Sequence, residues 1–321
     1  MLKNISIANY KSIRKLTLQA KRVNVFIGEP NTGKSNIIEA LGLFSGGNIS
    51  QDVFQELFRF RTLADLFFDQ QVSNPIAINA DNNIRYLEFG NGAFALRQVT
   101  NGSVQQGGIR IDQQGRFSNW LGGFGSVKLY QFKASAQINF PDYESLNPPF
   151  GQNLISILYT NKSLRRKVSD LFKSRGFRIE IKPVEMQMSL AKSIDDELYS
   201  FPYESISETW RRIVFYMALL ETNQNSTILL DEPETNTFPF YTAYLAERIA
   251  LDQTNQFFLT THNPYILGSI VGKTPAKDLA VFVVSMENFT TKVQSVSSEG
   301  LSKILDYGPD AFLNLDKLVQ A

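Results

Sequence analysis

The segment "GEPNTGKS", Gly28–Ser35, constrains this chain more than any other feature. It fits the pattern G-x-x-x-x-G-K-S, in which backbone N–H groups of a glycine-containing loop and of a helix amino terminus surround phosphate oxygens. A strand-like run, "VNVFIG", precedes it, and "SNIIEALGLF", with a helical pattern, follows it. Because these flanks are the ones the pattern requires, we expect a nucleotide-binding loop. The alternative is a simple glycine turn into a helix.

The residue types within the loop predict separate contacts. Lys34 would reach the β- and γ-phosphates, and the hydroxyl of Ser35 would bind Mg²⁺. The residues expected to contact the nucleotide here are Gly28, Asn31, Thr32, Gly33, Lys34, Ser35 and Asn36.

An acidic strand end follows at "TILLDEPE", Thr227–Glu234. Asp231 ends a hydrophobic strand and can hold Mg²⁺, which makes Ser35 and Asp231 the predicted metal residues. Glu232 is placed to orient or deprotonate an attacking water. Paired acids at a strand end also serve as helix caps, which is the structural alternative.

The single histidine, His262, lies in "FFLTTHNPYIL", residues 257–267. A run of β-favouring residues precedes it and Asn-Pro follows it, so we expect the imidazole at the carboxyl end of a buried strand. Open α/β sheets place their chemistry at this edge. The alternative is an isolated surface histidine.

Composition excludes several classes of protein. Hydrophobic residues at 43% and charged residues at 20% are ordinary for a globular chain. The sequence contains no apolar run of roughly 18 residues and no secretory signal, so we expect a cytoplasmic protein without membrane contact. One histidine and no cysteine argue against a zinc site. A net charge of +1 provides no general attraction to nucleic acid.

The charge is nevertheless uneven, because eight basic residues and two acidic residues lie between positions 162 and 182. The cluster is either a solvated helix face or a weak, sequence-independent contact for DNA phosphates. Its basic members are Lys162, Arg165, Arg166, Lys167, Lys173, Arg175, Arg178 and Lys182.

The order of strand and helix patterns predicts one α/β domain over residues 1–321. Short alternating segments with Asn-Gly turns predict an antiparallel β elaboration over residues 74–142. Residues 143–205 are predicted to form a helical and basic lobe, with two strands near 186–191 and 198–203.

Together, the phosphate loop, the Asp-Glu strand end and the later Thr-Thr-His strand end resemble ABC-type ATPases. The segments "LKNISIANYKSIRKLTL", "GKSNIIEAL" and "LLDEPETNTFPFY" resemble the repair-type branch: SMC, RecF and especially the OLD-like (AAA_21-type) ATPases. This likeness covers residues 1–45 and 200–267. It implies a P-loop NTPase of ABC type with a mostly parallel core sheet, an antiparallel β subdomain and a helical lobe, and it implies ATP as the nucleotide. Thr237-Phe238 replace the family's Leu-His, so no histidine acts at that point.

The resemblance also implies roles for single residues. His262 would contact the γ-phosphate, and Ser207 would act as the signature serine on the nucleotide of a second subunit. Thr209 replaces the usual glycine of that signature, which conflicts with close backbone approach, and Ser207 is alternatively a plain helix cap. Gln71, or its neighbour Gln70, is the candidate for the glutamine that senses the γ-phosphate.

Gln131 is the rival candidate for that glutamine role, and either residue is alternatively an ordinary strand or turn residue. Lys11 and Arg14 correspond to basic residues of the family that approach phosphate or base, although a surface role fits them equally.

The function implied by the resemblance is an ATP-hydrolysing homodimeric switch acting in DNA maintenance or in defence against phages and plasmids. OLD-type relatives carry a Toprim nuclease after the ATPase, and this chain ends soon after His262, so we expect any nuclease or effector to be a separate protein. One alternative is a nucleotide-gated scaffold with little turnover, which Thr209 suggests. Another is the ATP-binding subunit of a transporter, against which the wide gap between Lys34 and Asp231 counts.

Overall fold

The computed structural model describes residues 1–45, 50–104, 108–117, 126–134, 144–183, 185 and 187–319. A six-stranded sheet forms its centre, in the order β16-β15-β3-β14-β13-β9. All neighbouring pairs are parallel except the pair of β15 with β16. The prediction of a mostly parallel core sheet is therefore confirmed. Its strands are β3 (Val23–Ile27), β9 (Val127–Tyr130), β13 (Thr227–Leu230), β14 (Gln256–Thr260), β15 (Leu279–Glu287) and β16 (Thr290–Ser295).

Both faces of this sheet are buried, which explains why its central strands are almost continuously apolar. In β3, Val25 and Ile27 face one hydrophobic cluster and Phe26 faces the other. The first cluster includes residues of α5 (Glu208–Thr222), α6 (Pro239–Leu251) and α7 (Pro264–Lys273), while α1 (Lys34–Gly42) packs on the opposite face.

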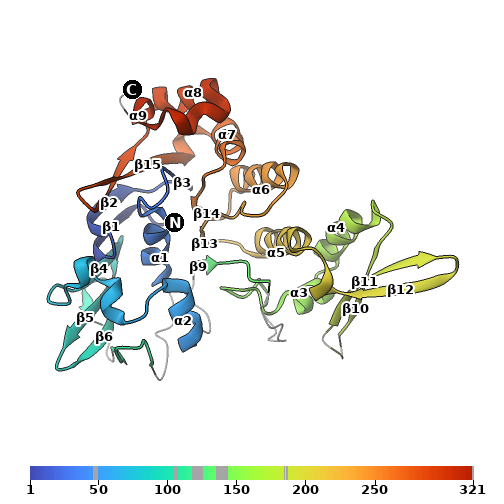
Figure 1. The fold of residues 1–321 in the computed structure, drawn as a ribbon, viewed down its shortest axis with the longest axis horizontal. Coiled ribbons are helices and arrows are strands. Elements are labelled where there is room, and N and C mark those ends of the chain that lie inside the picture. The colour runs from blue at the N-terminus through green and yellow to red at the C-terminus, as the bar shows by residue number, and fades with distance from the viewer. Residues whose placement is uncertain are drawn as a thin grey trace.

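A second, antiparallel sheet has the order β2-β1-β4-β5-β6-β7, with β8 pairing to β6. Helix α1 contacts β1 as well as β13 and β14 of the core, so it lies between the two sheets (Figure 1). The Asn-Gly pairs at 91–92 and 101–102 form the turns after β5 and β6, with positive φ at all four residues. The strands are β1 (Asn4–Tyr10), β2 (Ile13–Gln19), β4 (Ile76–Ala80), β5 (Asn83–Gly90), β6 (Ala93–Thr100), β7 (Ser103–Val104) and β8 (Ile109–Ile111).

The segment predicted as a helical lobe is helical only in its first half. Helices α3 (Leu154–Thr160) and α4 (Lys162–Lys173) precede an antiparallel sheet of β10 (Arg178–Lys182), β11 (Gln187–Ile194) and β12 (Glu197–Pro202). The two strands expected near 186–191 and 198–203 correspond to β11 and β12. Met186, and residues 135–143 where the two predicted insertions meet, lie outside the described residues. Strands β11 and β12 extend away from the body at the right of Figure 1.

Shorter elements complete the fold. Helix α2 (Gln51–Phe58) follows α1, and α8 (Ser298–Tyr307) and α9 (Leu315–Val319) close the chain beside α7. Among the described residues, no helix combines the length and the hydropathy that crossing a membrane requires.

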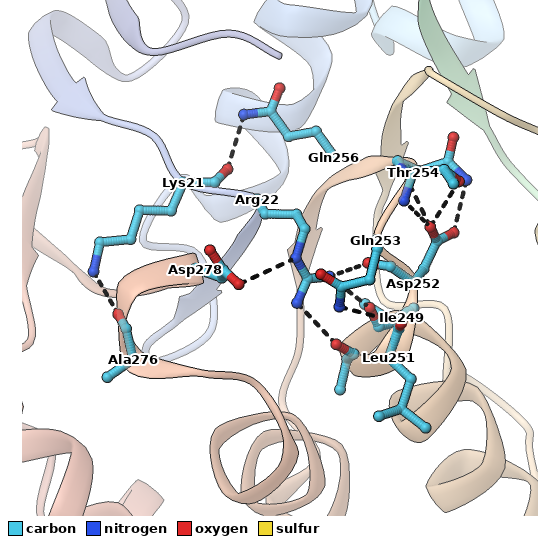
Figure 2. A network of polar contacts seen from close by, with 12 residues as sticks. Lys21, Arg22, Ile249, Leu251, Asp252, Gln253, Thr254, Gln256, Ala276 and Asp278 are labelled. Carbon is cyan, nitrogen blue, oxygen red and sulfur yellow. Dashed lines mark hydrogen bonds and ion pairs between the residues drawn. The ribbon is translucent and has the colours of Figure 1, made fainter.

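A buried arginine joins the phosphate-loop strand to α6 (Figure 2). Arg22 precedes β3 and is 6% exposed. Its guanidinium donates hydrogen bonds to carbonyl oxygens at the end of α6, including that of Ala250 at 2.9 Å and that of Asp252. Its Nε lies 3.8 Å from the carboxylate of Asp278. The last carbonyls of a helix have no partner within the helix, so Arg22 satisfies groups that would otherwise be buried and unpaired.

Replacing Arg22 with Met should lower the free energy of unfolding by about 2 kcal/mol, because hydrogen bonds to a charged donor are lost inside the protein. Urea denaturation measures the change. Lys21→Met is the matched control, since Lys21 donates one exposed hydrogen bond to Ala276 (Figure 2), and its loss should cost less than about 0.5 kcal/mol. Equal losses for the two variants would contradict this role for Arg22.

Candidate nucleotide-binding site

The phosphate loop begins at the carboxyl end of β3 and needs glycine at two positions. Gly28 has φ +155°, and a Cβ there would lie 2.1 Å from the carbonyl oxygen of Val284. Gly33 has φ +97°, and its Cβ would lie 2.1 Å from Oγ1 of Thr291. Side chains at these positions would be strained or would clash, so the loop is held tightly against β15 and β16.

A chain of hydroxyl groups fixes the loop from behind. Thr291 donates to the carbonyl oxygen of Thr32 at 2.9 Å, and its Oγ1 lies 2.7 Å from Oγ of Ser12. Asn36, in the first turn of α1, donates to the same Ser12 oxygen at 2.8 Å. Residues from β16 and from the β1–β2 turn therefore position a loop that is distant from both in sequence.

Lys34 is buried, and its Nζ donates to the carbonyl oxygens of Gly28 at 3.0 Å and Glu29 at 2.6 Å. Burial lowers the pKa of Lys34, and the nearby carboxylates of Glu232 and Asp231 act in the opposite direction. The ammonium group is thus held over the loop and satisfied there by neutral carbonyls. Such a cation can exchange these carbonyls for phosphate oxygens without leaving its position.

The acidic strand end lies beside this loop because β13, β14 and β3 are parallel neighbours. Asp231 follows β13 directly, and its Oδ1 accepts a hydrogen bond of 2.6 Å from the hydroxyl of Thr260, the last residue of β14. The backbone N–H of Glu232 donates to the same hydroxyl at 2.9 Å. Glu232 has φ +43°, a backbone conformation that is uncommon for residues other than glycine. Its hydrogen bond to Thr260 stabilises that conformation.

His262 meets Glu232 across the strand ends. Its Nε2 lies 3.0 Å from Oε1 of Glu232, and both side chains are partly exposed. Burial, together with the positive charge of Lys34, lowers the pKa of His262, while Glu232 and Asp231 oppose the shift. The imidazole is therefore mostly neutral near pH 7, and it can donate one N–H to an acceptor.

A buried carboxylate that the sequence did not single out supports this histidine. Glu234 accepts a 2.5 Å hydrogen bond from the hydroxyl of Thr261 and a 3.1 Å bond from the backbone N–H of His262. Its second oxygen, Oε2, is buried without a hydrogen-bond partner among the described residues. Desolvation accordingly raises the pKa of Glu234. It acts as a positioning residue for the strand end that carries the imidazole.

Lys34, Glu232 and His262 line a polar cavity of about 390 Å³, whereas Asp231 and Glu234 are not among the described residues that line it. Six of the seven predicted loop residues line it, and Gly28 lies just behind them as an acceptor for Lys34. Four lining residues were not predicted as contacts: Pro30, which lies within the predicted loop, and the more distant Ser12, Arg59 and Met286. Of the three distant residues, Ser12 alone lies within a segment that the family resemblance covers, "NYKS". The lining residues are Ser12, Pro30, Asn31, Thr32, Gly33, Lys34, Ser35, Asn36, Arg59, Glu232, His262 and Met286.

A second ionic group lies along α1. Glu39 is buried and accepts from Tyr10 at 3.1 Å and from Lys11 at 2.5 Å, and it also pairs with Arg59. Burial lowers the pKa of Lys11, which Glu39 opposes. Lys11 is therefore engaged with α1, whereas Arg59 both pairs with Glu39 and reaches the cavity.

The structure does not bring Gln71 to the cavity. Gln71 is exposed directly after the 3-10 turn Phe68–Gln70, in the segment between α2 and β4. Gln131 instead follows β9 directly, and the last residue of β9, Tyr130, is in register with Leu230, the residue before Asp231. The rival glutamine thus lies at the same sheet edge as the acidic pair. Spacing along the chain could not show which glutamine lies near the acidic pair, because the order of the strands in the sheet determines this.

Ser207 also lies outside the cavity of its own chain. It occupies the N-cap position of α5 and is exposed, yet its side chain makes no capping hydrogen bond. The neighbouring Thr209 donates to the carbonyl oxygen of Asn236 at 3.1 Å. The threonine that replaces the usual glycine therefore ties the start of α5 to the loop that follows Glu232.

Comparison with known proteins identifies the fold and the family. The family model for the AAA ATPase domain matches residues 1–208. The chain belongs to this AAA ATPase family. Its fold is that of SMC head domains, so the predicted P-loop ATPase fold is confirmed. An SMC head bound to the C-winged helix domain of ScpA superposes with a TM-score of 0.58 at 17% identity, over 94% of this chain and 99% of that one.

Two further comparisons are informative about this AAA ATPase. The Pyrococcus furiosus SMC head with an extended coiled coil gives a TM-score of 0.52 at 13% identity, over 95% of this chain and 98% of that one. An uncharacterized protein of Methanocaldococcus jannaschii is 27% identical over 135 residues, which cover 38% of this chain and 60% of that relative. The family match supports ATP binding and hydrolysis.

The raised pKa of Glu234 predicts a pH effect. The folded protein holds the Glu234 proton more tightly than the unfolded chain does, so its stabilising contribution is present at low pH and disappears as pH rises above 4.5. Wild-type protein should therefore lose stability relative to Glu234→Gln as pH increases from 4.5 to 7. Urea denaturation across this range measures the difference, with the exposed Glu299→Gln as the matched control. Parallel curves for wild type and Glu234→Gln would contradict the assignment.

Proposed function

We propose that this AAA ATPase is a cytoplasmic, ATP-hydrolysing switch that works as a homodimer. The strongest support is that the predicted site residues lie in two separate places on the chain. Lys34, Glu232 and His262 converge on one cavity, whereas Ser207 lies outside it and its hydroxyl makes no capping hydrogen bond. A site that is incomplete in one chain is completed most simply by the same surface of a second copy.

The residues that line the cavity, together with Asp231 beside Glu232, suit the triphosphate of ATP with Mg²⁺. The hydroxyl of Ser35 and the carboxylate of Asp231 supply oxygen, the donor that Mg²⁺ prefers. Bound Mg²⁺ would neutralise charge on the β- and γ-phosphate oxygens. Lys34 adds a fixed positive charge on the loop side. These groups favour a negatively charged transition state without a covalent intermediate.

Glu232 and His262 have separate roles in hydrolysis. The Glu232 carboxylate accepts a proton from, or orients, the attacking water, and the neutral imidazole of His262 donates its N–H toward the γ-phosphate. Nε2 of His262 lies 3.0 Å from Oε1 of Glu232, so its N–H would have to leave that carboxylate to reach the γ-phosphate. Glu234 keeps the histidine strand end in place through the backbone N–H of His262. Because Gln131 lies at the edge that carries Asp231, we also propose it as the γ-phosphate-sensing glutamine.

The start of α5 would act on the nucleotide of the partner subunit. A helix amino terminus with a free serine hydroxyl binds anions through its N–H groups and its partial positive charge. The hydrogen bond from Thr209 to Asn236 couples the start of α5 to the loop after Glu232, so the two segments would move together. Loss of the γ-phosphate would therefore weaken the contact between the two subunits. At the same time it would release the loop that follows Glu232.

We propose that the switch acts in DNA maintenance or in defence against phages and plasmids, together with a separate effector protein. The basic cluster gives limited support for DNA contact. Lys167 is paired with Glu221, and Arg165 donates to the carbonyl oxygen of Tyr159. Other basic side chains of α4, such as Arg166, have no ion pair among the described residues.

A nucleotide-gated scaffold with little turnover is the second candidate. Thr209 favours it, because a β-branched residue tied to Asn236 restricts the close backbone approach that glycine permits. The number of ATP molecules hydrolysed per site and minute separates the two candidates.

Glu232→Gln should trap the dimer, because it preserves nucleotide binding and removes the group that activates water. Light scattering with Mg·ATP should give about twice the monomer mass for this variant, and the monomer mass without nucleotide. The double variant Lys34→Ala with Glu232→Gln is the control and should stay monomeric, since it lacks the phosphate-binding lysine. A mass that does not respond to nucleotide in Glu232→Gln would rule out the simple dimer mechanism.

A further inference from the structure

A second cavity, of about 370 Å³, lies in the lobe between α4, β10–β12 and the start of α5, and it shares no lining residue with the nucleotide cavity. Aromatic rings form much of its wall. They come from the end of α4, the segment before β10, β12 and α5, and they are Phe172, Phe177, Phe201 and Trp210. Because these rings come from separate helices, strands and connecting segments, no single periodic pattern in the sequence predicts the cavity.

Two cations and no carboxylate are among the lining residues that the structure describes. The guanidinium carbon of Arg175 lies 4.3 Å from the centre of the Trp210 ring, and the group also donates to the hydroxyl of Tyr241 at 3.2 Å. Nζ of Lys192 lies 5.4 Å from the centre of the Phe201 ring. Both charges are therefore held beside aromatic faces. The cavity is complementary to a ligand that combines an aromatic group with a negative charge.

Strand β12 forms an open edge beside this cavity. Among the described residues it pairs only with β11, and all six of its residues are exposed, with Leu198 at 68% and Tyr199 at 44%. An apolar edge strand left uncovered is a site where another strand can pair.

The register shows which backbone groups are available. Asp195 and Asp196 both have positive φ and form the two-residue turn that closes the Ile194–Glu197 pair. Hydrogen-bonded and non-hydrogen-bonded pairs alternate along such a hairpin. The N–H and C=O groups of Leu198 and Ser200 consequently point away from β11, toward the free edge.

We propose that β12 and this cavity together bind an extended peptide segment of a partner protein. The segment pairs with β12 as a fourth strand of the β10–β12 sheet and places an aromatic side chain in the cavity. An Asp or Glu two positions from that aromatic residue is on the same face of the strand and lies against Arg175 or Lys192. The charge of the cavity and its continuity with the open edge select this partner over an uncharged apolar surface.

The position of the cavity also suggests that a bound peptide would affect the ATPase switch. This part of the inference rests on the proposed function. Its wall includes Ile206 and Trp210, which lie on either side of Ser207. A bound peptide would therefore bias the position of the serine that faces the second nucleotide. Peptide binding itself does not depend on ATP hydrolysis, so the two proposals can fail separately.

The test selects a phage-displayed library of random 12-residue peptides on the immobilised full chain without nucleotide, followed by calorimetry on enriched peptides. We expect an aromatic residue with Asp or Glu within two positions of it. Selection on Lys192→Glu should replace these acidic residues with Lys or Arg. The Lys34→Ala chain should bind the enriched peptide as tightly as wild type does, which separates this site from the ATPase.

Ser200→Pro tests the edge directly. It removes one outward N–H, which a proline on an edge strand can do without disturbing the ladder to β11, and it should weaken binding about tenfold. Ser200→Ala is the matched control: both variants lose the hydroxyl bond to Glu180, but Ala keeps the N–H and should bind like wild type. Circular dichroism checks that the hairpin is folded.

Three results would overturn the proposal. The first is no enrichment over a blank surface. The second is an enriched peptide whose affinity is the same for wild type, Ser200→Pro and Lys192→Glu. The third is occupation of the cavity by another class of ligand: a 12-nucleotide oligo-dT that binds and is lost in Lys192→Glu, or a nucleotide-independent dimer that Ser200→Pro dissociates.

Discussion

The site depends on one constraint, the burial of both faces of three adjacent parallel strands, β3, β14 and β13. Burial on both sides fixes their register, and parallel pairing brings their carboxyl ends to one edge. The phosphate loop, Asp231-Glu232 and His262 each begin where one of these strands ends. Thr260 then joins the acidic pair to the histidine strand through two hydrogen bonds. Residues more than two hundred positions apart thus share a single cavity.

The second requirement is a rigid phosphate loop that carries almost no side-chain bulk. The nearby atoms of Val284 and Thr291 leave no room for a Cβ at Gly28 or Gly33. The hydroxyl of Thr291 also supports the loop, so the same close contact that demands glycine supplies a hydrogen bond. Preorganisation of this kind lets the loop bind phosphate without a large loss of conformational freedom.

Local sequence patterns predict the parts of this protein that local physics determines. The loop glycines, the buried strands and the Asn-Gly hairpin turns follow from backbone conformation and hydrophobic pattern. Ser12, Thr291 and Arg59 could not be found in this way, because their roles arise from contacts between distant segments. The same reason explains why Gln131, and not Gln71, lies beside the acidic pair. The helical pattern likewise did not extend to β10, β11 and β12, which instead pair as an antiparallel sheet.

The central claim is that each nucleotide site is built from two chains, and mixing two inactive variants tests it most directly. Lys34→Ala damages the phosphate loop, and Ser207→Arg blocks the face offered to the partner. Each variant alone should hydrolyse almost no ATP, while an equimolar mixture should recover about a quarter of wild-type activity, since half of the dimers are mixed and each holds one intact site. No recovery on mixing, or full activity of Ser207→Arg alone, would contradict the account.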